Sequence, residues 1–61
     1  MKPKVKLTGQ DGNIFNLMGL ASRALRKSNL YDEAKEMSKK IFACGSYDEA
    51  LSIISEYCEI S

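Results

Sequence analysis

The stretch Ala43-Cys44-Gly45-Ser46-Tyr47-Asp48-Glu49-Ala50 contains both a helix stop and a helix start within a few residues. Gly45 is a natural left-handed residue just after a helix, and Ser46 followed by Glu49 forms an S-x-x-E capping box for the next helix. On either side of this corner, apolar residues recur at helical spacing. The chain is therefore predicted to be built from helices that meet at short turns.

Sixty-one residues are enough for one domain with one hydrophobic core, in a size range where stability is marginal. The apolar fraction of 44% and the charged fraction of 28% are typical of an ordinary globular domain. No apolar run is long enough for a membrane span, and the first residues lack the apolar segment of a signal peptide. We therefore expect a cytoplasmic protein with no membrane partner.

Apolar periodicity predicts three helices, over residues 13–28, 30–44 and 46–59. The first is apolar over more than half of its circumference, so we expect it to be central and to contact both of the others. The core positions expected from the three apolar stripes are Ile14, Leu17, Met18, Ala21, Ala24, Leu25, Leu30, Ala34, Met37, Ile41, Cys44, Tyr47, Ala50, Leu51, Ile54, Tyr57 and Cys58.

Polar turn residues precede the first two helices. Asp11 or Asn13 is the candidate N-cap of the first helix, and Asn29 or a neighbour is that of the second. Gly19 lies inside the first helix, where glycine costs about 1 kcal/mol relative to alanine. We therefore expect another backbone to approach closely at Gly19.

Residues 1–12 are predicted to form an extended arm and a turn. Lys4-Val5-Lys6-Leu7-Thr8 alternates polar and apolar residues, as a short strand does. Because a lone strand is not stable in water, the arm lies against the helices or pairs with a strand elsewhere, including its counterpart in a second chain. Residues 1–61 are thus predicted to form a single all-α domain, a compact three-helix bundle with a short extended N-terminal arm.

Catalytic and metal chemistry have few candidate residues. The chain has no histidine to act as a base, no phosphate-binding glycine loop and no obvious pair of buried carboxylates. On the predicted helices, Cys44 and Cys58 lie roughly 18 Å apart, which is too far for a disulfide. We expect buried, reduced cysteines, and we predict no catalytic residue, no metal site and no cofactor.

Surplus apolar surface on the third predicted helix points to a partner protein. Ile53 and Ile60 lie beside Tyr57 and form a second apolar edge, about 120° from the core stripe. Either the arm covers this edge or a partner does. The first functional hypothesis is a non-catalytic protein-protein interaction module, binding another protein or itself as a homo-oligomer. Its candidate contacts are Val5, Leu7, Ile53, Tyr57 and Ile60.

Charge is divided unevenly along the chain. Up to Lys27, six basic residues stand against one acidic residue, a net charge of +5, and the remainder has three lysines against seven acidic residues, a net charge of −4. The second hypothesis is a nucleic-acid accessory protein that binds phosphate through Arg23, Arg26 and Lys27, with the N-terminal lysines nearby. A helix-turn-helix around Gly45 is not expected, because the helix after it is acidic.

Three segments of the chain form a recognisable combination: Thr8-Gly9-Gln10-Asp11-Gly12-Asn13-Ile14-Phe15, the basic Arg23-Ala24-Leu25-Arg26, and Gly45-Ser46-Tyr47-Asp48-Glu49-Ala50-Leu51 with Glu56-Tyr57 after it. In this combination the chain resembles a small bacterial family of uncharacterised proteins that are often found in mobile genetic elements. The resemblance implies a compact helical fold and a bacterial cytoplasmic setting, and it implies no activity or site residues.

Overall fold

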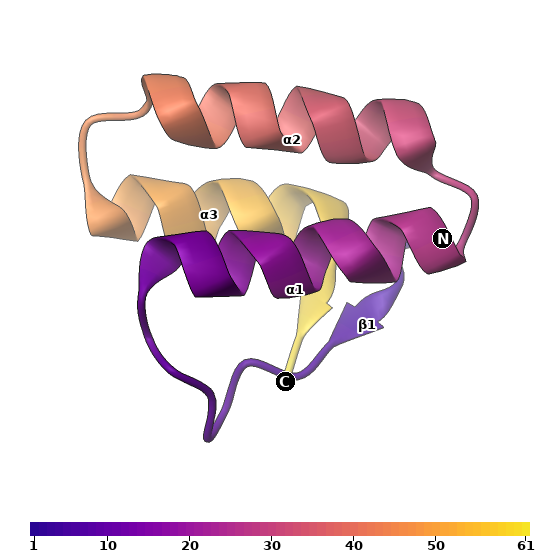
Figure 1. The fold of residues 1–61 in the computed structure, drawn as a ribbon, viewed down its shortest axis with the longest axis horizontal. Coiled ribbons are helices and arrows are strands. Elements are labelled where there is room, and N and C mark those ends of the chain that lie inside the picture. Colours follow the sequence, from indigo (N-terminus) through magenta and orange to yellow (C-terminus); the bar gives the residue numbers. More distant parts are fainter.

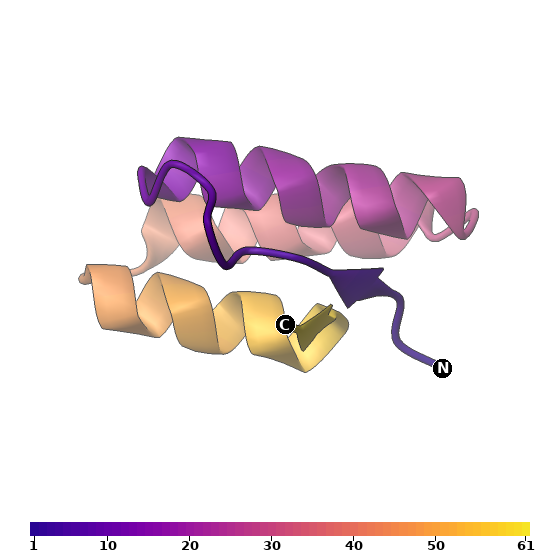
Figure 2. The ribbon, with the colours of Figure 1, turned by 90° about the horizontal axis from the view of Figure 1, so that it is seen from below.

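The computed structural model describes all 61 residues, which form three helices and two short strands. In chain order these are β1 (Lys4–Val5), α1 (Ile14–Lys27), α2 (Tyr31–Ala43), α3 (Tyr47–Tyr57) and β2 (Glu59–Ile60). Each helix packs against the other two, and α1 and α2 make the most extensive contact (Figure 1). In Figure 2 the N-terminal arm passes between α1 and α3, and β1 contacts α1 and β2. The predicted all-α three-helix bundle with an extended arm is confirmed.

The core forms where the three helices and β1 meet. Tyr47, which the periodicity placed inward, is exposed instead, and its hydroxyl donates a 2.6 Å hydrogen bond to the carbonyl of Gly12. This bond ties the turn before α1 to the start of α3. Apart from Val5 of the arm, the buried residues are positions that the apolar stripes predicted. They are Val5, Leu17, Ala21, Leu25, Ala34, Met37, Ile41, Ala50, Ile54 and Cys58.

The start of α1 is fixed by two polar side chains. The side-chain oxygen of Asn13 accepts a hydrogen bond from the backbone N–H of Phe15 at 2.9 Å. The Asp11 carboxylate accepts one from the N–H of Asn13 at 3.0 Å. Of the two candidate caps, Asn13 is therefore the N-cap, and Asp11 holds the turn in front of it.

Asn29 ends α1 instead of capping α2. Its φ of 62° is left-handed, and the N–H groups of Asn29 and Leu30 donate to the carbonyls of Arg26 and Leu25. This is a Schellman motif, in which asparagine replaces the usual glycine because its short polar side chain tolerates the left-handed region. Leu30 then precedes α2 without a side-chain cap. Of the candidates for the N-cap of α2, Asn29 is therefore wrong, and its neighbour Leu30 takes the position without a side-chain hydrogen bond.

The corner at Gly45 keeps its capping box but has no left-handed residue. Ser46 Oγ accepts a hydrogen bond from the N–H of Glu49 at 3.1 Å, as predicted. The Glu49 carboxylate reaches back to the N–H of Gly45 at 3.5 Å, one residue before the usual partner. Cys44 leaves α2 in an extended conformation, so Gly45 needs no positive φ, and the prediction of a left-handed glycine is wrong.

The third helix is shorter than predicted and is followed by a strand. It ends at Tyr57, and Cys58 turns the chain into β2, which pairs with β1 in parallel. The N–H of Ser61 donates to the carbonyl of Val5, and the N–H of Leu7 donates to the carbonyl of Ser61, both at 3.0 Å. The arm is thus paired within its own chain.

Gly19 does not lie at a close approach of two backbones. It is exposed on α1, and a Cβ atom built there would have nothing within 4 Å. The expected contact with another backbone is therefore wrong, and the fold gains nothing from glycine at this position.

The Gly19→Ala substitution is expected to stabilise the protein by about 1 kcal/mol, because alanine restricts the unfolded chain and favours the helix. In a domain of this size that corresponds to a rise in Tm of roughly 4 to 8 °C. Thermal unfolding followed by circular dichroism measures it. The matched change Ala21→Gly, at a fully buried position of α1, should lower Tm. A lower Tm for Gly19→Ala would contradict the open surface at Gly19.

Candidate nucleic-acid interface

A basic cleft lies between the arm and α1. Lys4 and Lys6 come from the arm, and Arg23 and Lys27 lie one turn apart on α1. The cleft has a volume of about 520 Å³, and no acidic residue lines it. The structure thus brings Lys4 and Lys6 together with two of the three residues predicted to contact phosphate.

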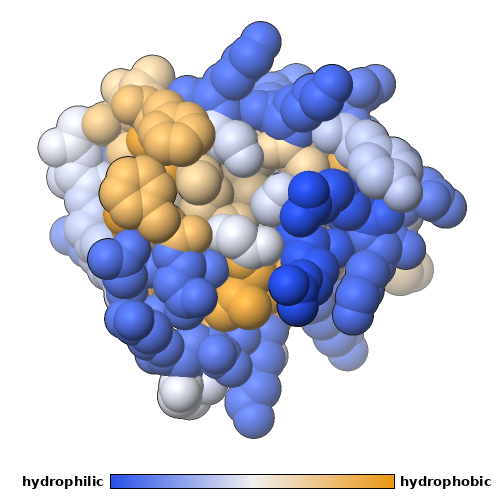
Figure 3. Space-filling view, in the orientation of Figure 1, coloured by the Kyte–Doolittle hydropathy of each residue, from blue (hydrophilic) through white to orange (hydrophobic).

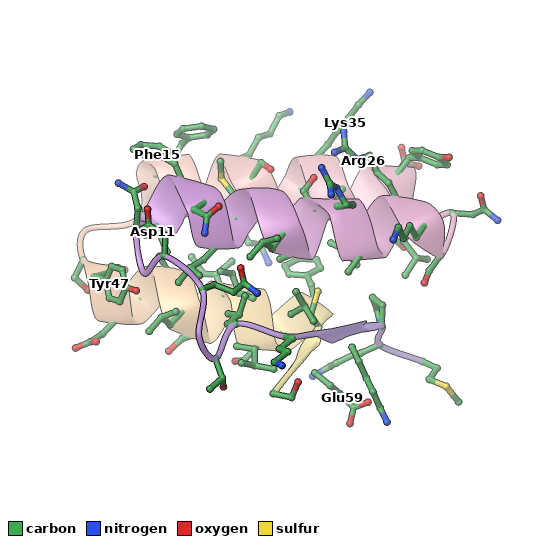
Figure 4. All side chains as sticks on the ribbon, turned by 60° about the horizontal axis from the view of Figure 1, so that its bottom comes forward. Asp11, Phe15, Arg26, Lys35, Tyr47 and Glu59 are labelled. Atoms are coloured by element: carbon green, nitrogen blue, oxygen red, sulfur yellow. The ribbon has the colours of Figure 1, made fainter.

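The third predicted phosphate contact, Arg26, lies in a groove between α1 and α2. This groove has a volume of about 600 Å³, and its other cations are Lys35 and Lys39 of α2. Phe15, Arg26 and Lys35 project from the same side of the helix pair, whereas Glu59 lies on the opposite side of the molecule (Figure 4). The predicted phosphate contacts are therefore divided between two hollows.

Arg23 and Arg26 connect the two hollows, because both line a smaller one on the outer face of α1. Lys40 is the one basic residue in a salt bridge, with Glu36 at 3.8 Å and Glu56 at 3.5 Å. No carboxylate lines any of the three hollows. Seven of the nine basic residues line them, and we call these the basic band: Lys4, Lys6, Arg23, Arg26, Lys27, Lys35 and Lys39.

Exposed aromatic rings border the basic band. Phe15 is 60% exposed and Phe42 is 66% exposed, and their ring centroids lie 6.0 Å apart. The two rings border a further hollow of about 310 Å³, lined mainly by apolar residues. Figure 3 shows apolar surface gathered where α1 begins and α2 ends. A contiguous exposed apolar patch on a small domain is typical of an interaction site.

Sequence reasoning did not identify Phe15, Phe42, Lys35 and Lys39 as site residues. A usable signal was present, since α1 and α2 each carry four residues at i, i+4, i+7 and i+11, the spacing of one helix face, that line the groove or the smaller hollow on α1. The two rows are Phe15, Gly19, Ser22 and Arg26 on α1, and Tyr31, Lys35, Ser38 and Phe42 on α2.

The five residues predicted to contact a partner protein come together around the paired chain ends. Val5 belongs to the core and is only 7% exposed. Leu7, Ile53 and Tyr57 are half-buried against the core. Ile60 of β2 is 42% exposed. Val5 pairs with Ile60 in the short sheet, and Ile60 stays at the surface.

Tyr57 also belongs to a polar cluster between α2 and α3. Its hydroxyl donates a hydrogen bond to the Glu36 carboxylate, and Lys40 Nζ lies 5.2 Å from its ring centroid. Loss of surrounding water, and then the bond to Glu36, raise the pKa of Tyr57. The hydrogen bond to Tyr57 raises the pKa of Lys40. Both groups stay protonated at neutral pH, and the cluster links α3 to α2.

The two cysteines are free and separate. Cys58 is fully buried, with Sγ 3.8 Å from the carbonyl oxygen of Ala21, and burial raises the pKa of its thiol. Cys44 is half-buried at the end of α2, with Sγ 3.5 Å from the carbonyl oxygen of Ser46. Because the thiolate is the reactive form, Cys58 is poorly suited to act as a nucleophile.

No three side chains of the types His, Cys, Asp or Glu come together where a metal ion would bind. None of the helices has the length and apolar character needed to cross a bilayer.

Comparisons of the chain with protein-family models, with curated proteins and with solved structures found no match. The resemblance to a bacterial family therefore stays a prediction, and function has to be inferred from the site itself.

Cys58 is expected to resist thiol reagents in the folded protein, whereas Cys44 should react quickly. Labelling at neutral pH with a chromogenic disulfide should modify one thiol per chain, and the second only after denaturant is added. The Cys44→Ser variant should lose the fast phase, and a fast phase that survives would contradict the burial of Cys58.

The Cys58 thiol should also make the stability of the folded protein depend on pH in the alkaline range. The folded state holds the Cys58 proton to a higher pH than the unfolded chain does, so stability is complete below the ordinary thiol pKa of 9.0 and falls as pH rises above it. The pH dependence of Tm measures this fall. The Cys58→Ala variant should show a smaller fall, and an equal fall would assign it to other groups.

Proposed function

We propose that this protein is a non-catalytic module that binds nucleic acid by holding the phosphate backbone on its basic band. The observation that supports this most strongly is the gathering of seven basic side chains, none of them in a salt bridge, along three connected hollows without a carboxylate. Charge clustered along one helix and its neighbours is the electrostatic pattern of a nucleic-acid-binding surface.

The distribution of charge matters here more than its total, because the net charge is only +1. Asp48, Glu49 and Glu56 lie on α3 and Glu59 on β2, and none of them lines a hollow. A polyanion is therefore attracted to the side of α1 and repelled by the acidic side of α3. Under this proposal α1, not the helix after the Gly45 corner, faces the nucleic acid.

The shape of the surface favours an extended anion over a small one. The basic band runs from the arm, across α1, to α2, on a molecule that measures 27 × 25 × 16 Å. A single phosphate group would contact only one of the three hollows. A nucleic-acid backbone presents repeated phosphates and uses all three at once. A cytoplasmic location is part of the proposal, and two free cysteines suit that reducing compartment.

Binding should weaken steeply with salt. If four cations contact phosphates of a single strand, a rise in salt from about 50 to about 200 mM should weaken binding about fiftyfold. The double variant Arg23→Gln/Lys27→Gln removes two of these contacts, so the same rise should weaken its binding only about sevenfold. Fluorescence anisotropy with a short labelled oligonucleotide measures both dependences.

A matched control removes the same charge outside the basic band. Lys2 donates to the carbonyl of Ser55 and Lys40 bonds to Glu56, so the Lys2→Gln/Lys40→Gln variant leaves all three hollows unchanged. It should keep most of the affinity and the salt dependence of the original protein. If both double variants lose affinity equally, only net charge matters and the assigned surface is wrong. If no nucleic acid binds at low salt, the proposed function fails.

A second candidate function is protein association through the predicted partner contacts Ile53, Tyr57 and Ile60, and the exposure of Ile60 supports it. Sedimentation at tens of micromolar should then show a species larger than the monomer, which the Ile60→Asp variant should convert to a monomer. A strictly monomeric original protein would contradict self-association through this edge.

A further inference from the structure

We propose that the nucleic acid bound here is single-stranded, with unpaired bases stacking on the Phe15 and Phe42 rings while the neighbouring phosphates follow the groove between α1 and α2. This inference rests on the proposed function and adds to it the class of strand and the residues that select it.

The two rings are the first observation. Both side chains are mostly exposed, so part of each ring surface is open to a ligand. In a duplex the faces of the bases are covered by their neighbours, whereas an unpaired base offers a free face to an aromatic side chain. The hollow of about 310 Å³ beside the rings has an apolar lining that includes Ile14 and Ala50. It offers a planar base an apolar wall in addition to the rings.

The position of the cations is the second observation. Phe42 lines both the hollow beside the rings and the groove that contains Arg26 and Lys35. A strand whose base stacks at Phe42 therefore has cations for its next phosphates in the same groove. Tyr31 is also exposed and lies 11 residues before Phe42 on α2, about 16 Å away. The groove thus has an aromatic ring near each end and basic groups between them.

Gly19 is the third observation. It lines the hollow on α1 between Phe15 and Arg26, and no packing contact requires the absence of its side chain. Glycine weakens a helix interior, so this position lowers stability without a benefit to the fold. Because Gly19 has no side chain, nothing at this position obstructs a strand that passes between the two rings and Arg26.

An acidic helix from a partner protein is the other occupant that this groove could hold. A helix lying between α1 and α2 would leave the cleft with Lys4, Lys6 and Lys27 unused, on the other side of α1. A flexible strand follows the surface around α1 and uses both hollows. The extent of the basic band therefore favours nucleic acid.

A tryptophan in place of the phenylalanine at position 42 provides a direct test, because the chain contains no tryptophan. In the Phe42→Trp variant, a short single-stranded oligonucleotide should quench the fluorescence, since a stacked base contacts the indole. An abasic oligonucleotide of equal length and charge should bind more weakly and leave the fluorescence unchanged. The Ser52→Trp variant, at an exposed position of α3 that lines none of the hollows, should show no quenching with either.

Substitutions in the original protein separate stacking from simple apolar contact. Phe15→Leu and Phe42→Leu keep an apolar side chain but remove the ring, and each should weaken single-strand binding about tenfold. Phe42→Tyr keeps the ring and should keep the affinity. Gly19→Gln adds an uncharged side chain to the smaller hollow on α1 and should also weaken binding. All three positions changed are exposed, and circular dichroism checks that each of the four variants is folded.

The outcomes distinguish this inference from the proposed function. If duplex binds as tightly as single strand and the leucine variants bind normally, the inference is wrong although the protein binds nucleic acid. If neither form binds at low salt, both fail. If only an acidic helical peptide changes the Phe42→Trp fluorescence, the groove belongs to a protein partner and the inference is overturned. Quenching by the single strand, with weaker binding of duplex, supports it.

Discussion

The parallel pairing of β1 with β2 is the interaction on which the arrangement of the molecule depends. Three helices of 14, 13 and 11 residues provide a small core, and Val5 of the arm completes it. The arm reaches this place because the carbonyl of Pro3 accepts from the N–H of Glu59 at 2.9 Å, and the carbonyl of Val5 accepts from that of Ser61. The backbone groups of the arm thus find partners at the other end of the chain, as buried polar groups require.

The same pairing determines the electrostatics of the candidate site. It holds Lys4 and Lys6 beside Arg23 and Lys27, so four like charges share one cleft. Their mutual repulsion opposes folding, although water and salt screen it at this exposed position. An anion in the cleft removes the repulsion, whereas packing alone gives no reason to gather the charges. Unfavourable arrangements of this kind are more often found at functional sites than elsewhere.

The fold was largely predictable because long helices carry a repeated apolar pattern. Leu17, Met37 and Ile54 were all placed in the core by their spacing alone. The errors concern single residues or very short segments. The left-handed position fell at Asn29 and not at Gly45, because the hydrogen bonds of each turn, not the residue type alone, decide which residue takes a positive φ. A two-residue strand such as β2 has no detectable alternation, so only tertiary pairing reveals it.

The candidate site was predictable in its charge but not in its shape. Arg23, Arg26 and Lys27 stood out as a cluster in the sequence. Their division between two hollows depends on which neighbour packs on each side of α1, and the sequence does not state this. In the sequence, Lys39 and the other cations of α2 have acidic residues close to them, which is typical of an ordinary solvated helix face.

The two paired strands are also the most distant contacts in the sequence, joining Lys4 to Glu59 and Val5 to Ile60. Pairing these strands closes nearly the whole chain into a loop, which has a high cost in conformational entropy. Locally, only four strand residues and a few backbone hydrogen bonds offset this cost. Contacts of this kind form late in folding and open before the rest of the structure does. The cleft beside the arm exists only while these ends are closed. A ligand bound in the cleft therefore stabilises the pairing of the chain ends. Ligand binding and closure of the fold are thermodynamically coupled.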